Sequence, residues 1–317
     1  MQMLRKVFSA LLTAVLAAVF CCPVLSAAAE VPEKGAALMF EDRIPDGYRK
    51  PLPEGAGRVE RITYPSKDYA GSGEDVEKPA LVYLPAGYSE DVPCDVLVLC
   101  HGIGGTENEW GFTDPNHGIR YVADHLFAEG AVKNLIIVMP NGRSCTNYKN
   151  TSFDNMQAFY AFGQELRNDL LPYIDAHYST WGSRTPGDLS AARDHRAMAG
   201  LSMGGMQTIN IGLCECLDLF SAFGAFSAAP TSYPSAQIAS VLKKFPDNLS
   251  ICFFYSIFGR QDGIAWASAS AAAQKMPADS RLSEANWYFQ EVPGEHSFAV
   301  WDLGLYNFLR LLGSMQE

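Results

Sequence analysis

A serine between two glycines marks the first place where this sequence could do chemistry. Ser202 is the centre of Gly200-Leu-Ser-Met-Gly204, and Gly-x-Ser-x-Gly is typical of a nucleophilic serine on a tight strand-to-helix turn. The glycines matter because such a turn leaves little room for neighbouring Cβ atoms. The apolar run Ala197–Leu201 precedes the serine, and the helix-like segment Met203–Leu213 follows it. A glycine-rich turn with an idle serine is the alternative, but this position favours a nucleophile.

An activated serine also needs a general base and an acid that orients the base. His296 is the one histidine downstream of the serine, and it follows the expected strand Trp287–Val292. The five earlier histidines are expected to be ordinary surface or core residues. For the acid, Asp262 directly follows the apolar run Ile251–Phe258 on a tight turn, whereas Asp218 is the second candidate. The order serine, acid, histidine is the one that a nucleophile elbow requires.

The oxyanion that forms on a tetrahedral intermediate needs two backbone N–H donors. Met203, the residue after the serine, is expected to supply one. The glycine-rich loop His101–Gly105 is expected to supply the other, with Gly102 and Ile103 as candidate donors. A plain glycine-rich turn is the alternative interpretation of that loop. Because no Cys/His spacing is typical of zinc, we expect neither a metal nor another cofactor.

Short apolar runs alternate with amphipathic segments from residue 58 onward. The expected strands are Arg58–Tyr64, Pro79–Leu84, Asp95–Cys100, Leu135–Met139, Ala197–Leu201, Ala222–Ser227, Ile251–Ile257 and Trp287–Val292. The expected helices are Ile119–Glu129, Gln157–His177, Met203–Leu213, Ser235–Lys244, Ala265–Met276 and Leu303–Ser314. This alternation predicts an α/β fold, with a mostly parallel, doubly wound sheet and helices on both faces. Since no break in composition divides residues 58–317, we expect one catalytic domain there.

The balance of charges excludes one class of partner. The chain has 24 Lys+Arg against 35 Asp+Glu, a formal net charge of −11, and no basic cluster. Binding to nucleic acid needs positive charge for the phosphates, so we expect no nucleic-acid partner. The cysteines are too sparse for a disulfide scaffold, and both free thiols and one or two bridges remain open.

The N-terminal 29 residues have the features of a secretory signal peptide. Two basic residues precede the apolar stretch Val7–Leu25, and small residues precede an expected cleavage between Ala29 and Glu30. An uncleaved membrane anchor is the alternative, because the apolar stretch is nearly long enough to span a bilayer. We expect a secreted or periplasmic protein with no stable membrane insertion after cleavage. Residues 30–57, rich in Pro, Gly and charge, are expected to form a leader on the surface.

Three separated blocks of sequence carry a resemblance to a known family. Leu99–Trp110, Ala197–Gly205 and Gly294–Leu309 resemble the feruloyl esterase group of carbohydrate esterase family 1, an esterase-D-like branch of the α/β-hydrolases. Two shorter matches, Tyr83–Tyr88 and Ser227–Pro230, extend the resemblance over most of the expected domain. It implies the α/β-hydrolase fold for this chain.

The resemblance also implies roles for individual residues and a substrate class. Ser202, Asp262 and His296 would be the catalytic triad of a serine esterase. The substrate would be a feruloyl or other hydroxycinnamoyl ester on plant cell-wall polysaccharide or oligosaccharide. Two alternatives stay open: an acetyl xylan esterase or other small-acyl carboxylesterase, and an inactive relative that only binds carbohydrate. Four aromatic residues are candidate walls of the substrate pocket, although such residues belong more often to the core than to a pocket: Trp110, Phe112, Tyr148 and Trp266.

Overall fold

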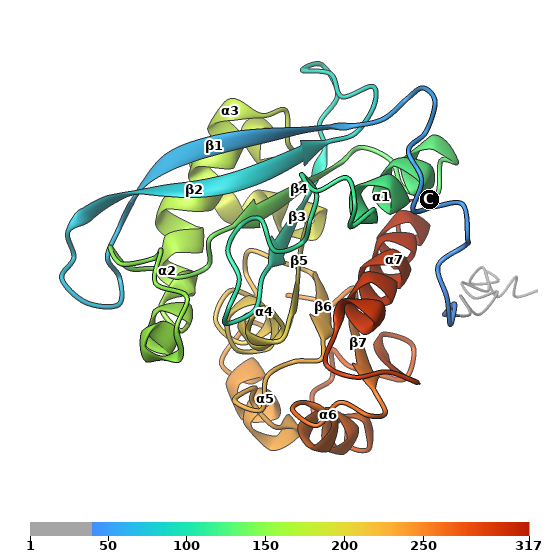
Figure 1. Cartoon of the computed structure of the whole chain (residues 1–317). Helices are drawn as coiled ribbons and strands as arrows, with labels where there is room; N and C mark the ends of the chain where they lie inside the picture. Colours follow the sequence, from blue (N-terminus) through green and yellow to red (C-terminus); the bar gives the residue numbers. More distant parts are fainter. Residues whose placement is uncertain (1–39, 317) are drawn as a thin grey trace, which may run out of the picture. The chain divides into compact units, whose positions relative to one another are not determined.

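An eight-stranded sheet forms the centre of the protein in the computed structural model, which describes residues 40–316 (Figure 1). Its strand order is β1-β2-β4-β3-β5-β6-β7-β8. The strands are β1 Arg58–Lys67, β2 Asp75–Leu84, β3 Asp95–Cys100, β4 Leu135–Pro140, β5 Arg196–Leu201, β6 Ala222–Phe226, β7 Phe253–Gly259 and β8 Trp287–Val292. β2 pairs antiparallel with β1 and β4, and all other pairs are parallel. The predicted mostly parallel, doubly wound sheet is therefore confirmed.

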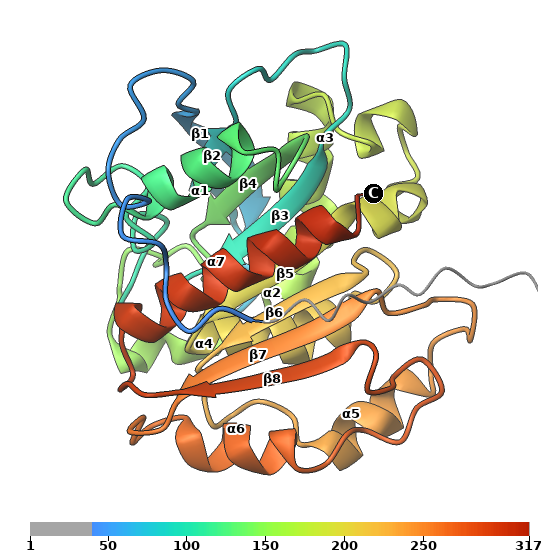
Figure 2. The same ribbon diagram turned by 90° about the vertical axis from the view of Figure 1, so that its right-hand side faces the viewer.

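Helices lie on both faces of this sheet, as Figure 2 shows. The helices are α1 Ile119–Ala128, α2 Phe162–Glu165, α3 Leu171–His177, α4 Met203–Gln207, α5 Ser235–Leu242, α6 Trp266–Ala273 and α7 Phe298–Ser314. α1 and α7 cover one face, and α2, α3 and α4 cover the other. Strands β4, β5 and β6 are buried along their whole length, which explains why, apart from Arg196 at the start of β5, their sequences are apolar throughout rather than alternating.

Three helices differ clearly from the sequence-based expectation. The expected helix 203–213 is divided into α4 and a π-helical segment at Thr208–Leu213. The expected helix 157–177 is divided into a 3₁₀ helix at Phe153–Phe159, α2, a π-helical segment at Leu166–Leu170, and α3. α7 begins at Phe298, five residues before the expected start at Leu303, directly after the extended residue Ser297. The earlier start places the candidate base immediately before the helix. The position of a helix start depends on such capping geometry, which apolar spacing does not encode.

Residues 40–57 of the expected leader run along α1 and α7 and contact both. The backbone N–H of Glu41 donates to Oδ1 of Asn307 at 3.1 Å, and Arg49 forms an ion pair with buried Asp302 at 2.8 Å. Tyr48 stacks on His125 with ring centroids 4.7 Å apart. The predicted signal peptide and residues 30–39 of the predicted leader lie outside the described residues.

Two further observations concern residues 40–316. None of the helices in this range has the length and apolar character that crossing a bilayer requires. Within the same range, the six cysteines form no disulfide.

Candidate active site

Ser202 lies on the turn between β5 and α4 in a backbone conformation that serine rarely adopts. Its φ is 51° and its ψ is −113°. The surrounding backbone holds this conformation, because Ser202 N–H donates to the carbonyl of Phe226 at 2.9 Å and its own carbonyl accepts from Ala229 N–H at 2.9 Å. Residues kept in sparsely populated regions are characteristic of functional sites. The turn thus has the geometry of a nucleophile elbow.

The two glycines of the motif are required by close backbone contacts. A Cβ atom on Gly200 would lie 2.5 Å from the carbonyl carbon of Gly204. A Cβ atom on Gly204 would in turn lie 2.5 Å from the carbonyl oxygen of Cys100. Both distances are far below van der Waals contact with rigid backbone, so the elbow can form only with glycine at these positions.

The structure brings the three predicted catalytic residues into one chain of hydrogen bonds. Ser202 Oγ lies 3.0 Å from Nε2 of His296, and Nδ1 of the same ring lies 2.9 Å from Oδ2 of Asp262. Asp262 follows β7 and His296 follows β8, so adjacent parallel strands deliver the acid and the base to the same edge of the sheet. This is the order of contacts that general-base activation of a serine requires.

The alternative acid lies elsewhere. Asp218 forms a two-pronged ion pair with Arg167, with N–O distances of 2.7 and 2.8 Å. Its carboxylate is thus already engaged by a partly exposed guanidinium, and the structure brings Asp262 rather than Asp218 to the histidine.

Backbone donors keep Asp262 ionised. Burial by itself would raise the pKa of this carboxyl, but hydrogen bonds from Ala265 N–H and from His296 outweigh burial and lower the pKa below its usual value. The N–H groups of Ile264 and Ala265 reach Oδ1 at 3.0 and 2.8 Å, which leaves Oδ2 for the imidazole. An ionised carboxylate behind the ring orients it and stabilises the imidazolium form.

The loops that carry acid and base are bonded to each other. Gln261 N–H donates to the carbonyl of Gly294 at 2.8 Å, and the Gln261 side chain accepts from Gly294 N–H at 2.8 Å. A Cβ on Gly259 would lie 2.3 Å from that same carbonyl, so the close approach needs glycine there. These reciprocal bonds fix the separation of Asp262 and His296 independently of the side chains themselves.

The predicted oxyanion hole is only partly available. Met203 N–H is the first amide of α4, and its place at the helix start leaves it without an intrahelical acceptor. Gly102 N–H, by contrast, already donates to Oε2 of Glu109 at 2.6 Å. The prediction that Gly102 is a donor to the oxyanion therefore needs correction for this structure. Ile103 is the remaining predicted donor in the loop.

His101 fixes the orientation of this loop. Its Nε2 accepts from Gly142 N–H at 3.3 Å, and its Nδ1 lies 2.7 Å from the carbonyl oxygen of Gly102. Burial lowers the pKa of His101 to about 3, so the ring is neutral and Nδ1 carries the proton that is donated to Gly102. Because the carbonyl and the next N–H of a planar trans peptide point in opposite directions, this bond sets the direction of Ile103 N–H.

Two of the four predicted pocket walls belong to the core instead. Trp110 is 1% exposed and donates its indole N–H to the carbonyl of Cys100 at 3.0 Å, and Phe112 is also 1% exposed. Neither ring offers a face to a substrate, so both predictions are wrong. Tyr148 is half-buried, with the ammonium of Lys78 5.2 Å from its ring centroid. Trp266 is 44% exposed, four residues after the candidate acid.

An apolar cluster beside the nucleophile escaped the sequence analysis. The half-buried side chains of Ile103, Met156 and Tyr160 pack against buried Met203 and Phe159. Met203 directly follows Ser202, so this cluster forms a wall next to the reacting serine. Met156 lies in the 3₁₀ helix, one residue before the expected helix 157–177, and Tyr160 is the C-cap of that 3₁₀ helix. Only the tertiary structure brings them to the site.

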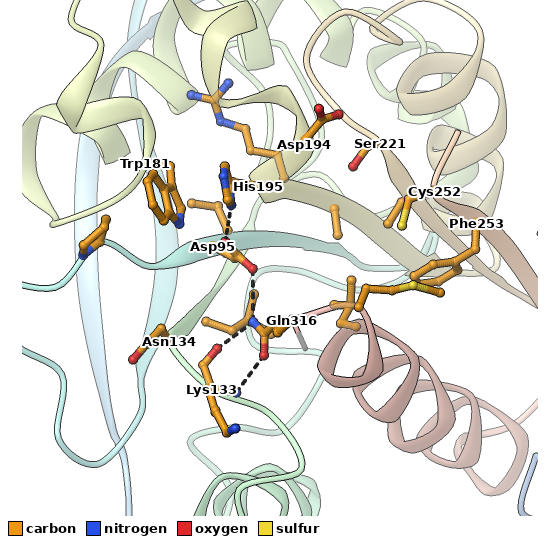
Figure 3. A pocket seen from close by; sticks show the side chains of 18 residues that line it. Asp95, Lys133, Asn134, Trp181, Asp194, His195, Ser221, Cys252, Phe253 and Gln316 are labelled. Carbon is orange, nitrogen blue, oxygen red and sulfur yellow. Dashed lines mark hydrogen bonds and ion pairs between the residues drawn. The ribbon is translucent and has the colours of Figure 1, made fainter. Parts of the chain in front are cut away.

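A separate cavity of about 360 Å³ lies at the opposite edge of the sheet (Figure 3). Trp181 stacks on His195 with centroids 4.2 Å apart, His195 bonds Asp95 at 2.8 Å, and Asp95 accepts from Gln316 at 3.0 Å. These residues lie near the beginnings of β3 and β5, whereas the triad lies at the strand ends. Open α/β sheets bind substrates at the carboxyl ends of their strands, so this cavity is not the reaction site.

Comparison with known proteins agrees with this geometry. The sequence profile of a family described as "Putative esterase" matches residues 75–311. The chain belongs to this esterase family. Endo-1,4-beta-xylanase Y of Acetivibrio thermocellus is 31% identical over 264 residues, and an endo-1,4-beta-xylanase/feruloyl esterase of Xylanibacter ruminicola is 33% identical over 184 residues. These alignments cover 79% and 56% of this chain but only 22% of each relative, so the chain spans about a fifth of their length.

Solved esterase structures share the fold. The feruloyl esterase module of Clostridium thermocellum, complexed with sinapinate, superposes with a TM-score of 0.69 at 27% identity, covering 86% of this chain and 95% of that one. A ferulic acid esterase of Anaeromyces mucronatus, in complex with ferulic acid, gives 0.68 at 23% identity, covering 87% and 99%. The α/β-hydrolase fold and the resemblance to the feruloyl esterase group are thereby confirmed.

Proposed function

We propose that this member of the esterase family is a secreted serine esterase that hydrolyses hydroxycinnamoyl esters of plant cell-wall polysaccharide. One observation carries the reaction type: the hydrogen-bond chain from Ser202 through His296 to Asp262. The related xylanase/feruloyl esterase and the sinapinate-bound esterase module support the acyl group. Export is supported by the sequence of residues 1–29.

The reaction proceeds in two acyl-transfer steps. Ser202 Oγ attacks the ester carbonyl carbon while its proton passes to Nε2 of His296, and the carboxylate of Asp262 stabilises the resulting imidazolium. The N–H groups of Met203 and Ile103 receive the oxyanion. The imidazolium then returns its proton to the leaving alcohol oxygen as the C–O bond breaks. Water attacks the acyl-serine with His296 again as base, which releases the acid and restores the serine.

The apolar cluster around Met203 is the proposed contact for the acyl group. An aromatic acyl chain gains from lying against Ile103, Met156 and Tyr160, because each side chain retains some exposed apolar surface there. An acetyl group is too small to use the whole wall, so this surface favours hydroxycinnamoyl over acetyl esters. Exposed Trp266, near the acid loop, is a second proposed contact.

A substrate panel tests the proposal. Purified wild-type protein and Ser202→Ala are compared on methyl ferulate, p-nitrophenyl butyrate and acetylated xylan. We expect the highest kcat/KM on methyl ferulate and no enzymatic turnover by the variant. A preference for acetylated xylan would assign the chain to the small-acyl alternative. Binding of xylan without hydrolysis of any ester would favour the inactive carbohydrate-binding relative.

A further inference from the structure

Glu109 is a half-buried carboxylate at the candidate active site for which the mechanism above has no role. Its Oε2 accepts the backbone N–H of Gly102 at 2.6 Å. The side chain reaches Gly102 by crossing Gly105, where an added Cβ would lie only 2.1 Å from Oε2. A Cβ built on Gly102 would lie 3.5 Å from Oε2 and 3.4 Å from Cβ of Ser202. The carboxylate and the nucleophile therefore flank the same glycine.

A buried cation holds the same loop by its carbonyl groups. The guanidinium of Arg143, which is fully buried, donates to the carbonyl oxygen of Gly105 at 2.7 Å and to that of Ile103. The loop thus has two of its carbonyls bound to a cation and one amide bound to an anion. Burial raises the pKa of Glu109, whereas the Gly102 N–H and the positive charge of Arg143 favour the ionised form.

These contacts leave the amides of Ile103 and Gly104 without an acceptor among residues 40–316. Of the two, only Ile103 N–H belongs to the peptide whose carbonyl His101 holds. Gly102 N–H is used by Glu109, and the Gly102 carbonyl is used by His101 and by Gly105 N–H, at 2.7 and 3.2 Å. Across residues 40–316, no group accepts a hydrogen bond from Ile103 N–H. Because both ends of the Gly102 residue are held, the following peptide plane cannot rotate freely. Its N–H keeps one direction.

We propose that Glu109 is a positioning residue of the oxyanion hole, which holds Gly102 N–H so that Ile103 N–H, together with Met203 N–H, faces the ester oxygen. The proposal rests on the esterase function above. Glu109 acts through the loop and not by contact with the substrate. Its removal should weaken stabilisation of the transition state and leave binding of the ground-state ester nearly unchanged.

Two substitutions separate positioning from charge. Glu109→Ala removes the acceptor, and we expect kcat on p-nitrophenyl acetate to fall by about 10- to 100-fold, somewhat less than the loss of a whole oxyanion donor, with KM changed by less than about twofold. Glu109→Gln keeps an oxygen that can accept Gly102 N–H, and we expect kcat within about fivefold of wild type. A kcat for Glu109→Gln as low as that of Glu109→Ala would overturn positioning by this hydrogen bond.

Glu107→Gln is the matched control. Glu107 lies on the same loop, but its carboxylate bonds Arg61 at 2.7 Å and Asn141 at 3.5 Å rather than Gly102. We expect wild-type kcat for this variant. The thermal midpoint is measured for every variant. If Glu109 had only a structural role, the fall in kcat of Glu109→Ala would be accompanied by a fall in its thermal midpoint.

The binding of phenylboronic acid gives a second readout, because its tetrahedral adduct with Ser202 presents an oxygen to the hole. We expect its inhibition constant to rise at least fivefold in Glu109→Ala and to change less than twofold in Glu107→Gln. An inactive wild type would refute the esterase function itself. An active wild type with Glu109→Ala unchanged in both kcat and inhibition would refute only the role of Glu109.

Discussion

Oδ2 of Asp262 lies 2.9 Å from Nδ1 of His296, on the side of the imidazole away from the nucleophile. An ionised carboxylate can only accept hydrogen bonds, so this contact requires the proton on Nδ1 and leaves Nε2 as an acceptor for Ser202 Oγ at 3.0 Å. The contact thus decides whether the ring can act as a base toward the serine.

Replacing this acid with an amide should nearly abolish turnover. The side chain of Asp262→Asn can donate to Nδ1 and so favour the tautomer that carries its proton on Nε2, which cannot accept from Ser202. We expect kcat on p-nitrophenyl acetate to fall by about 10³- to 10⁴-fold. Asp218→Asn is the control, since that carboxylate pairs with Arg167, and we expect activity within about twofold of wild type. A large fall in kcat for Asp218→Asn, with Asp262→Asn unaffected, would make Asp218 the acid instead of Asp262.

Alanine at the elbow should destabilise the fold as well as the site. The Cβ of Gly200→Ala would lie 2.5 Å from the carbonyl carbon of Gly204, and rigid backbone must move to admit it. We expect the free energy of unfolding to fall by about 1–3 kcal/mol, measured by urea denaturation, with loss of esterase activity. Gly47→Ala is the matched control, because nothing lies within 4 Å of its added Cβ. The free energy of unfolding of this variant should stay within about 0.5 kcal/mol of wild type. Equal stability of the two variants would contradict the steric account.

Buried His101 should make stability depend on pH. Its pKa is about 3 in the folded protein, and an unfolded histidine titrates near about 6.5, so the unfolded state binds more protons between these values. The free energy of unfolding should therefore fall as pH drops below about 6.5, by up to about 1.4 kcal/mol per pH unit from this residue. The free energy of unfolding is measured by urea denaturation at pH 5 and at pH 7. Its difference between the two pH values should be smaller in His101→Gln than in wild type and unchanged in exposed His177→Gln. The same change in the free energy of unfolding between pH 5 and pH 7 for wild type and His101→Gln would rule out this contribution.

The two tryptophans predicted as pocket walls should respond differently to truncation. Trp110→Ala removes a fully buried indole and its bond to the Cys100 carbonyl, and we expect a loss of about 3–5 kcal/mol in the free energy of unfolding. Trp266→Ala should cost less than about 1 kcal/mol, because that ring is 44% exposed. On methyl ferulate, Trp266→Ala should raise KM while leaving KM for p-nitrophenyl acetate unchanged. A stability loss that is equal in the two variants would contradict the difference in burial.

The sequence predicted those parts of the site that depend on order along the chain. Ser202, Asp262 and His296 each follow a recognisable strand, and parallel strands must end at the same edge, so their meeting could be expected. Glu109 and Arg143 could not be found in the same way. Their contacts with the oxyanion loop depend on how two loops fold over one another, and no local spacing encodes that arrangement.

The same distinction explains the errors in the pocket. An aromatic side chain on the loop after a strand can point into the core or toward solvent with little change in sequence pattern. The Trp110 side chain points into the core and donates to the Cys100 carbonyl. The apolar wall of Ile103, Met156 and Tyr160 depends on where a 3₁₀ helix packs. Apolar periodicity predicted a helix in that region but not its division into shorter pieces.

Covalent labelling tests the central claim most directly. The protein is treated with a fluorophosphonate, which phosphonylates an activated serine, and the modified peptide is identified by mass spectrometry. We predict one phosphonate per chain, located on Ser202, with esterase activity lost in proportion to labelling and no label on Ser202→Ala. A phosphonate on another residue, or undiminished labelling of Ser202→Ala, would contradict the assignment of Ser202 as the nucleophile.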